Sequence, residues 1–163
     1  MATLTIESNG MLEFTAVYYN GQQIAGLKEL YLHLDEDGTF ESIIQYEGSD
    51  KKIYTKNIFS DYMDNIRIVP PSFTEEEAAN LVSFSVESTG YIDDTILFMN
   101  ENELDGVVNV FLHIKATKNK SIVNSLLKKG NYESVEFKAQ VTYRNEDDSL
   151  ETEDIFQWKI FQK

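Results

Sequence analysis

Two histidines are the residues in this chain whose type and spacing most suggest chemistry. His33 and His113 stand 80 residues apart, each directly after a leucine. An imidazole ring is a common ligand of transition metals and a common proton carrier near neutral pH. A metal site needs further ligands, yet Asp35 lies two residues after one histidine where Lys115 lies after the other. We therefore expect each histidine to make local hydrogen bonds on a β-sheet face, with a metal or partner-contact role as the alternative.

A cluster of lysines is the second group with a chemical role. The segment 115–130 contains five lysines and no acidic residue, in a chain whose formal net charge is −14. Such a basic island would be attracted to an acidic surface, either of a partner protein or of a second copy of the chain. The candidate partner contacts are Lys118, Lys120, Lys128, Lys129, His33 and His113.

Acidic residues are numerous, but their spacing indicates turns. Residues 35–38, Asp-Glu-Asp-Gly, have carboxylates like those of a calcium loop. An EF-hand loop, however, spaces its ligands over about 12 residues between two helices, and the segments on either side here alternate like strands. We interpret this run and the acidic run 146–148 as hairpin turns.

The chain has no catalytic signature. The nucleophile elbow, the P-loop, the dinucleotide-binding glycines and the zinc-protease motif are all absent. Without cysteine there is no disulfide and no thiolate chemistry. We therefore expect no catalytic residue, no bound metal and no cofactor, and a protein that is not an enzyme.

The elements that position these residues come from a repeated sequence. Residues 2–34 align with residues 82–114 at a constant offset of 80, and residues 39–59 align with 136–156 at an offset of 97. The identical pairs of the first stretch are Glu7/Glu87, Ser8/Ser88, Gly10/Gly90, Thr15/Thr95, Asn20/Asn100, Gly26/Gly106, Leu32/Leu112 and His33/His113. We interpret the shared glycine, serine and asparagine residues as turn determinants.

Alternating apolar residues predict β-strands in both copies. The predicted strands are 2–7, 11–19, 27–34, 39–47, 51–59 and 64–69 in the first copy, and 82–88, 91–99, 107–116, 135–144 and 150–162 in the second. A capping box, formed by either Ser72 with Glu75 or Thr74 with Glu77, predicts a helical turn after two consecutive prolines. An apolar stripe followed by glycine predicts an α-helix over 120–129.

The fold class expected is mainly all-β. It is a tandem-duplicated antiparallel β-sandwich or barrel with pseudo-twofold symmetry, plus one α-helix in the second copy and a short helical turn in the linker. The boundaries are 1–69 for the first repeat, 70–80 for the linker, and 81–163 for the second repeat with a helical insertion near 117–133. A unit of about 60–80 residues is marginally stable alone, so we expect one shared core.

The function expected from these features is that of a non-enzymatic protein-interaction or assembly module, with self-association as one form of it. One alternative is a small-molecule-binding β-barrel, and a further one is an acidic nucleic-acid mimic that inhibits a basic partner. The negative charge disfavours nucleic acid and anionic membranes as partners. Because the sequence shows no signal peptide and no long apolar run, we expect a cytoplasmic protein.

Overall fold

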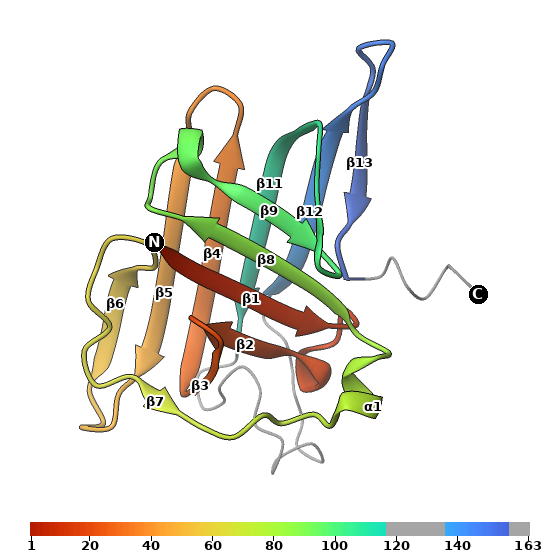
Figure 1. The fold of residues 1–163 in the computed structure, drawn as a ribbon. Coiled ribbons are helices and arrows are strands. Elements are labelled where there is room, and N and C mark those ends of the chain that lie inside the picture. Colours follow the sequence, from red (N-terminus) through yellow and green to blue (C-terminus); the bar gives the residue numbers. More distant parts are fainter. Residues whose placement is uncertain (117–135, 157–163) are drawn as a thin grey trace.

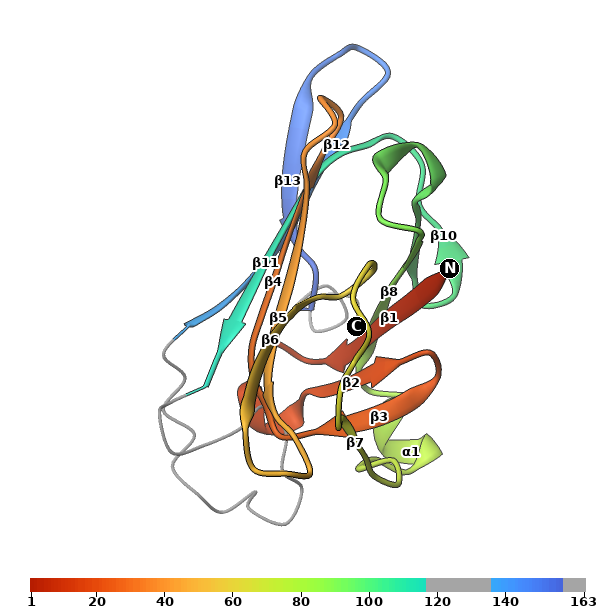
Figure 2. The same cartoon turned by 90° about the vertical axis from the view of Figure 1, so that its left-hand side faces the viewer.

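Two antiparallel β-sheets packed face to face make up the fold (Figures 1 and 2). The computed structural model describes residues 1–116 and 136–156. The first sheet has seven strands in the order β10 (Asn102–Glu103), β9 (Ile96–Met99), β8 (Val82–Ser88), β1 (Ala2–Ser8), β2 (Ala16–Tyr19), β3 (Gln22–Ala25) and β7 (Arg67–Ile68). The second has six, in the order β13 (Leu150–Asp154), β12 (Glu136–Arg144), β11 (Val107–Lys115), β4 (Leu27–Asp35), β5 (Phe40–Glu47) and β6 (Ile53–Asn57).

The mainly β, antiparallel character predicted from the sequence is confirmed, and the barrel alternative is wrong. Neither sheet closes on itself within the residues described, because each ends in two edge strands. Figure 2 shows the two sheets edge-on, and Figure 1 shows the strands of one sheet running steeply across those of the other. Within the described residues, no helix is long and apolar enough to cross a membrane.

The centre of each sheet is built from both halves of the chain. Strand β1 pairs with β8, and β4 pairs with β11. The register sets Thr5 opposite Ser85 and Leu32 opposite Leu112, so a central residue faces the residue 80 positions later in the chain. Outward from these pairs, β2 and β3 correspond to β9 and β10, and β5 and β6 correspond to β12 and β13. Among the described strands, β7 alone has no counterpart.

The core lies between the two sheets. Every second side chain of β1 and β8 is buried, as expected when one face of a strand packs inward. The central strands contribute the buried residues Leu4, Ile6, Phe84, Val86, Leu30, Leu32, Leu34, Val110, Leu112 and Ile114. Burying an aliphatic side chain of this size stabilises the fold by about 1.5–3 kcal/mol. This single core joins the two halves.

The predicted strand 11–19 is wrong in its first part, which instead forms a 3₁₀ turn. Residues Leu12–Phe14 make this turn (η1) before β2 begins. The Thr15 hydroxyl donates to the Met11 carbonyl at 2.8 Å and also hydrogen-bonds the Ser8 hydroxyl at 2.8 Å. These local bonds compete with strand pairing, which explains why the alternation fails here. A second turn, η2 (Ile92–Asp94), precedes β9 in the same way.

The short helical turn predicted in the linker is confirmed as α1 (Glu75–Ala78). The second of the two possible capping boxes forms: Glu77 N–H donates to Thr74 Oγ1 at 3.1 Å, and Thr74 N–H donates to Glu77 Oε1 at 3.0 Å. The predicted helix over 120–129, and the insertion near 117–133 that contains it, lie outside the described residues.

Candidate functional site

Both histidines lie on the outer face of the six-stranded sheet, on its two central strands. The register sets His33 opposite Phe111 and His113 opposite Tyr31. The four rings form a row in the order His33, Phe111, Tyr31, His113, with successive ring centroids 6.0, 5.8 and 5.7 Å apart. Two aromatic rings therefore stand between the imidazoles, and the histidines do not share a site.

Each histidine is held by local polar partners. His33 Nε2 lies 3.1 Å from Asn109 Oδ1, and His113 Nε2 lies 2.6 Å from Glu29 Oε2. No group of three or more potential metal ligands occurs within residues 1–116 and 136–156. This geometry fits the local hydrogen bonding expected from the sequence. The role of the histidines as partner contacts stays a prediction, and the other candidates, Lys118, Lys120, Lys128 and Lys129, lie outside the described residues.

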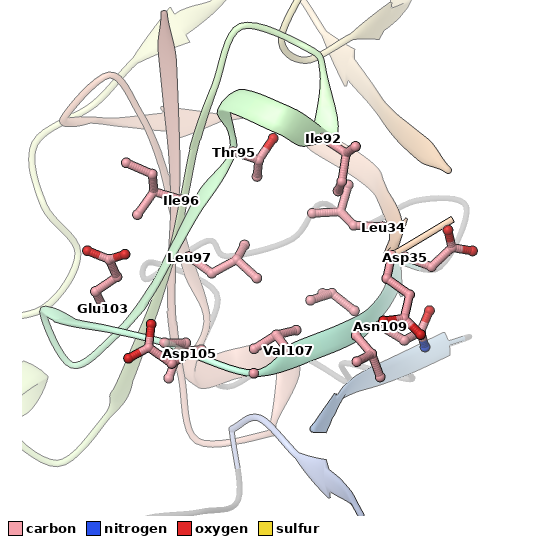
Figure 3. A pocket seen from close by; sticks show the side chains of 15 residues that line it. Leu34, Asp35, Ile92, Thr95, Ile96, Leu97, Glu103, Asp105, Val107 and Asn109 are labelled. Atoms are coloured by element: carbon pink, nitrogen blue, oxygen red, sulfur yellow. The ribbon is translucent and has the colours of Figure 1, made fainter. Parts of the chain in front are cut away.

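A pocket of about 240 Å³ lies between the sheets where β9, β10 and β11 meet the end of β4 (Figure 3). Its lining is mixed, and in Figure 3 the apolar side chains of Leu34, Leu97 and Val107 point into it. Strand β9 supplies one wall, while β11 and the end of β4 supply the other. The pocket is therefore a gap left by the packing of two sheet corners.

Four acidic residues lie at the rim of this pocket, and we call the whole the acid-lined pocket. The acidic lining residues are Asp35, Glu36, Glu103 and Asp105. Glu36 is neutralised by Arg144, whose Nη2 lies 2.6 Å from its carboxylate. Glu103 and Asp105 are exposed and form no ion pair with any described residue. Within residues 1–116 and 136–156, this part of the lining therefore retains a negative charge without a paired cation.

The Asp35 carboxylate is fixed at the edge of the pocket. It accepts hydrogen bonds from the backbone N–H groups of Asp37 and Thr39, both at 3.0 Å. The Thr39 backbone bond is the main cause that lowers the pKa of Asp35 below its usual range. This side chain is therefore ionised at neutral pH and points in a defined direction.

The corresponding corner of the first half is closed. Leu97, which points into the pocket, is partly exposed, whereas Val17, which lies 80 positions earlier, is buried. Leu104 is partly exposed, whereas its counterpart Ile24 is buried. The two halves share the strand order, but only the second half leaves this corner open.

Strand β7 and the residues after it cover the first-half edge. Ile68 of β7 pairs with Ile24 of β3, and Val69 N–H donates to the Gln23 carbonyl at 2.9 Å. The Gln23 side chain then holds Ser72, accepting from its N–H at 2.7 Å and donating to its hydroxyl at 2.6 Å. In the second half, β10 is the last strand of the sheet, and none of the described residues pairs with its outer side.

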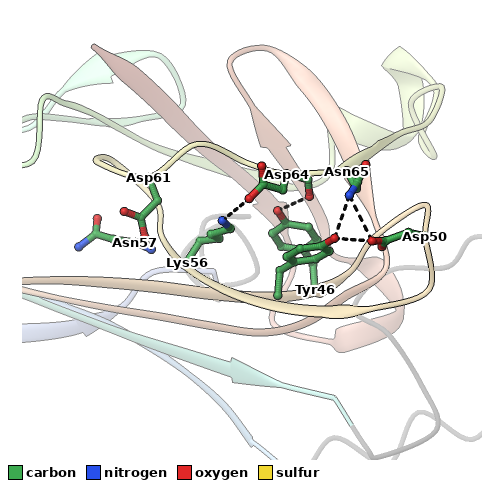
Figure 4. Close-up of polar contacts among 8 residues, drawn as sticks. Tyr46, Asp50, Lys56, Asn57, Asp61, Asp64 and Asn65 are labelled. Carbon is green, nitrogen blue, oxygen red and sulfur yellow. Dashed lines mark hydrogen bonds and ion pairs between the residues drawn. The ribbon is translucent and has the colours of Figure 1, made fainter.

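A polar cluster near β6 has a structural explanation (Figure 4). The Tyr46 hydroxyl donates to the Asp64 carbonyl at 2.7 Å, and Lys56 Nζ donates to the Asp64 carboxylate at 2.6 Å. Burial raises the pKa of Tyr46 to about 12, so this hydroxyl remains a donor at neutral pH. The cluster ties the segment 58–66 across the side of the first half, between β6 and β7.

Comparison with known protein families, with curated proteins and with solved structures finds no match for this chain. Its site must therefore be interpreted from its own geometry.

The acid-lined pocket was missed by inspection of the sequence. One signal for it was present in the alignment of the two halves at an offset of 80: acidic Glu103 and Asp105 stand where the first half has neutral Gln23 and Ala25. Such a change of charge at matched positions marks a surface that differs between the halves. What the sequence did not indicate was that these positions border a cavity.

Proposed function

We propose that the protein is a non-enzymatic interaction module whose acid-lined pocket binds a basic, partly apolar segment of a partner protein. The observation that supports this is the contrast between the two corners, one covered by the chain itself and the other open and acidic. The apolar side chains that point into the pocket would contact a hydrocarbon side chain and remove it from water. The carboxylates at its rim would attract cationic neighbours.

The size of the pocket favours a protein segment over a small molecule. Pockets that enclose drug-sized ligands usually measure roughly 300–1,000 Å³, and this one measures about 240 Å³. Such a volume suits one or two side chains whose backbone remains outside. The small-molecule alternative also loses its scaffold, since neither sheet closes within the described part of the chain.

We also infer that the two halves arose by tandem duplication and are related by a pseudo-twofold axis. The register of both central pairs supports this, because it matches the offset of 80 seen in the sequence. The backbone supports it too: Asn20 and Asn100 have φ angles of 51° and 52°. On this interpretation one corner contributes to stability, while the matching corner is available for binding.

The test is a peptide titration followed by fluorescence anisotropy. The probe is a fluorescein-labelled peptide, Ile-Arg-Ile-Val-Pro-Pro-Ser-Phe, with the sequence of residues 66–73 that cover the first-half edge. The double variant Glu103→Gln with Asp105→Ala gives the second half the residues that the first half has at the matching positions, Gln23 and Ala25. We expect it to bind the peptide at least tenfold more weakly than the unmodified protein.

A matched control separates local from overall charge. The variant Glu75→Gln with Glu76→Ala removes the same two charges from α1, where both residues are exposed. It should bind the peptide as the unmodified protein does, and added salt should weaken binding in both. The proposal would be contradicted if both double variants lost peptide affinity equally. It would also be contradicted if the peptide bound neither the unmodified protein nor the variants.

A further inference from the structure

We infer that the bound segment adds to β10 as an extra antiparallel strand, in the way that β7 adds to β3. This inference rests on the proposed function and names how the partner binds and what sequence it requires. The template is internal. Without β7, two strands would flank the central pair β8–β1 on each side: β9 and β10 on one side, β2 and β3 on the other. Strand β7 pairs with β3, and the matching position beside β10 is open among the described residues.

The backbone of β10 presents the groups that an added strand needs. Leu104 N–H donates to the Leu97 carbonyl at 2.8 Å, so Leu104 directs its backbone groups toward β9. Because successive residues of a strand direct their backbone groups to opposite sides, those of Glu103 face the open side. Its counterpart Gln23 uses the same carbonyl to accept from Val69. An added strand would repeat this bond at Glu103.

The charge of the edge selects the class of occupant. Residues 100–105 read Asn-Glu-Asn-Glu-Leu-Asp and contain neither lysine nor proline, so the charge that guards this edge is negative and does not repel a basic strand. The first half is protected differently, since two prolines directly follow Val69 and prevent a further strand from pairing there. An acidic strand such as β13 of a second copy would be repelled here. A basic segment of a different protein would be attracted.

The register predicts the side chains of that segment. In the first half, Ile68 lies opposite Ile24, and Arg67 lies opposite Ala25. When the same register is applied to β10, one residue of the bound segment lies opposite Leu104. Its side chain is on the same face of the sheet as Leu104, and this face lines the pocket. Its two neighbours share the face of Glu103 and Asp105. The recognised motif is therefore basic-apolar-basic in an extended conformation.

Peptide variants test this motif. In the probe Ile-Arg-Ile-Val-Pro-Pro-Ser-Phe, the residue corresponding to Val69 would lie opposite Glu103, so its replacement by lysine should tighten binding at least threefold. Replacement of the residue corresponding to Arg67 by glutamate should weaken binding at least tenfold. If either change has the opposite effect, the proposed alignment on β10 is wrong.

A proline on the edge tests the strand addition itself. In the Glu103→Pro variant the N–H that faces the open side is lost, while the pairing with β9 remains. Because the substitution also removes the Glu103 charge, the comparison is with Glu103→Gln, which removes the same charge and keeps the N–H. We expect Glu103→Pro to bind the peptide at least tenfold more weakly than Glu103→Gln. The matched control is Thr152→Pro on β13, because Ile155 N–H donates to the Ala139 carbonyl and Thr152 therefore faces the outer side of that edge. This control should bind the peptide normally.

Hydrogen exchange of the unmodified protein gives a readout that does not depend on a variant folding. Saturation with the peptide should slow exchange of the Glu103 amide at least tenfold, as measured by NMR. If that rate is unchanged while binding still depends on Glu103 and Asp105, strand addition is overturned and the proposed function stands. If binding does not depend on these acids, both are overturned. A peptide-sensitive dimer in sedimentation would assign the site to a second copy and overturn the partner proposed.

Discussion

At the scale of single residues, Tyr46 shows how one polar group closes a side of the sandwich. The side chain is completely buried and stacks on Tyr54 with ring centroids 5.4 Å apart. Its hydroxyl reaches the Asp64 carbonyl, which belongs to the segment that crosses between the two sheets. Burial is the main cause of the raised pKa, and the nearby Asp64 charge adds to it.

The Tyr46→Phe variant should lose stability, because the Asp64 carbonyl loses its donor. We expect a decrease of about 1–2 kcal/mol in the free energy of unfolding. The pKa of Tyr46 rises on folding from 10.0 to about 12, so its stabilising contribution is complete below pH 10 and is lost as the pH rises through about 12. Urea unfolding from neutral pH to about pH 12 should therefore show a shallower alkaline decline for the variant. Tyr62→Phe, at a site 81% exposed, should change neither quantity. An alkaline decline that is identical in the three proteins would contradict this assignment.

At the scale of elements, glycine turns connect the two sheets. Gly26 lies between β3 and β4 with a φ of 77°, and its carbonyl accepts from Glu47 N–H at 2.9 Å. The corresponding Gly106 has a φ of 72° and accepts from Arg144 N–H at the same distance. Each turn thus takes the chain from an outer part of the seven-stranded sheet (β3 or β10) to a central strand of the six-stranded sheet (β4 or β11).

Replacing these glycines by alanine should destabilise the fold to different degrees. Any residue with a Cβ pays about 1–2 kcal/mol in this left-handed conformation. At Gly26 the added Cβ would also lie 2.6 Å from the Glu47 carbonyl oxygen and against the Arg67 guanidinium, whereas at Gly106 the nearest atom is 3.4 Å away. The melting temperature should therefore be lower for Gly26→Ala than for Gly106→Ala. The control Gly21→Ala, with a φ of 84° and nothing within 4 Å, should be affected least. Equal destabilisation at the three sites would refute the close approach at Gly26.

Most strands could be predicted from long alternating stretches of sequence. Very short strands and pairings between distant segments could not. The pattern of residues 2–8 and 136–144 gives strands directly, since every second side chain faces the core. Strands β3 and β10 contain only four and two residues, too few to establish an alternation. The pocket depends on which edge β7 covers, and that pairing joins Ile24 to Ile68 across a long stretch of chain. Local patterns do not encode such a contact.

At the scale of the whole molecule, neither half has a complete core. The central pairs β1–β8 and β4–β11 bring one strand from each half into both sheets. Each half alone would expose the inner faces and the edges of two central strands. Residues 1–80 and 81–163 are also close to the size at which a domain is only marginally stable.

We expect fragments 1–80 and 81–163 to be unfolded when each is expressed separately. The intact chain should unfold in one cooperative transition, since one core serves both halves. Circular dichroism of the separate fragments, of their equimolar mixture and of the intact chain measures this, and the mixture should regain β structure. A cooperative transition in either isolated fragment would show that the halves are independent domains.

The pairing of residues 80 positions apart at the centre of both sheets has a consequence for how the chain folds. Folding slows as the sequence separation of native contacts increases, because long loops must close before such contacts form. When the first half has just been synthesised, β1 and β4 are complete but their partners β8 and β11 do not yet exist. These strands carry buried apolar side chains such as Leu4, Ile6 and Leu32, and one edge of each stays open until residues 82–115 follow. The acidic side chains of the first half, which repel other nascent copies, would then protect the protein at the stage when it is most prone to aggregate.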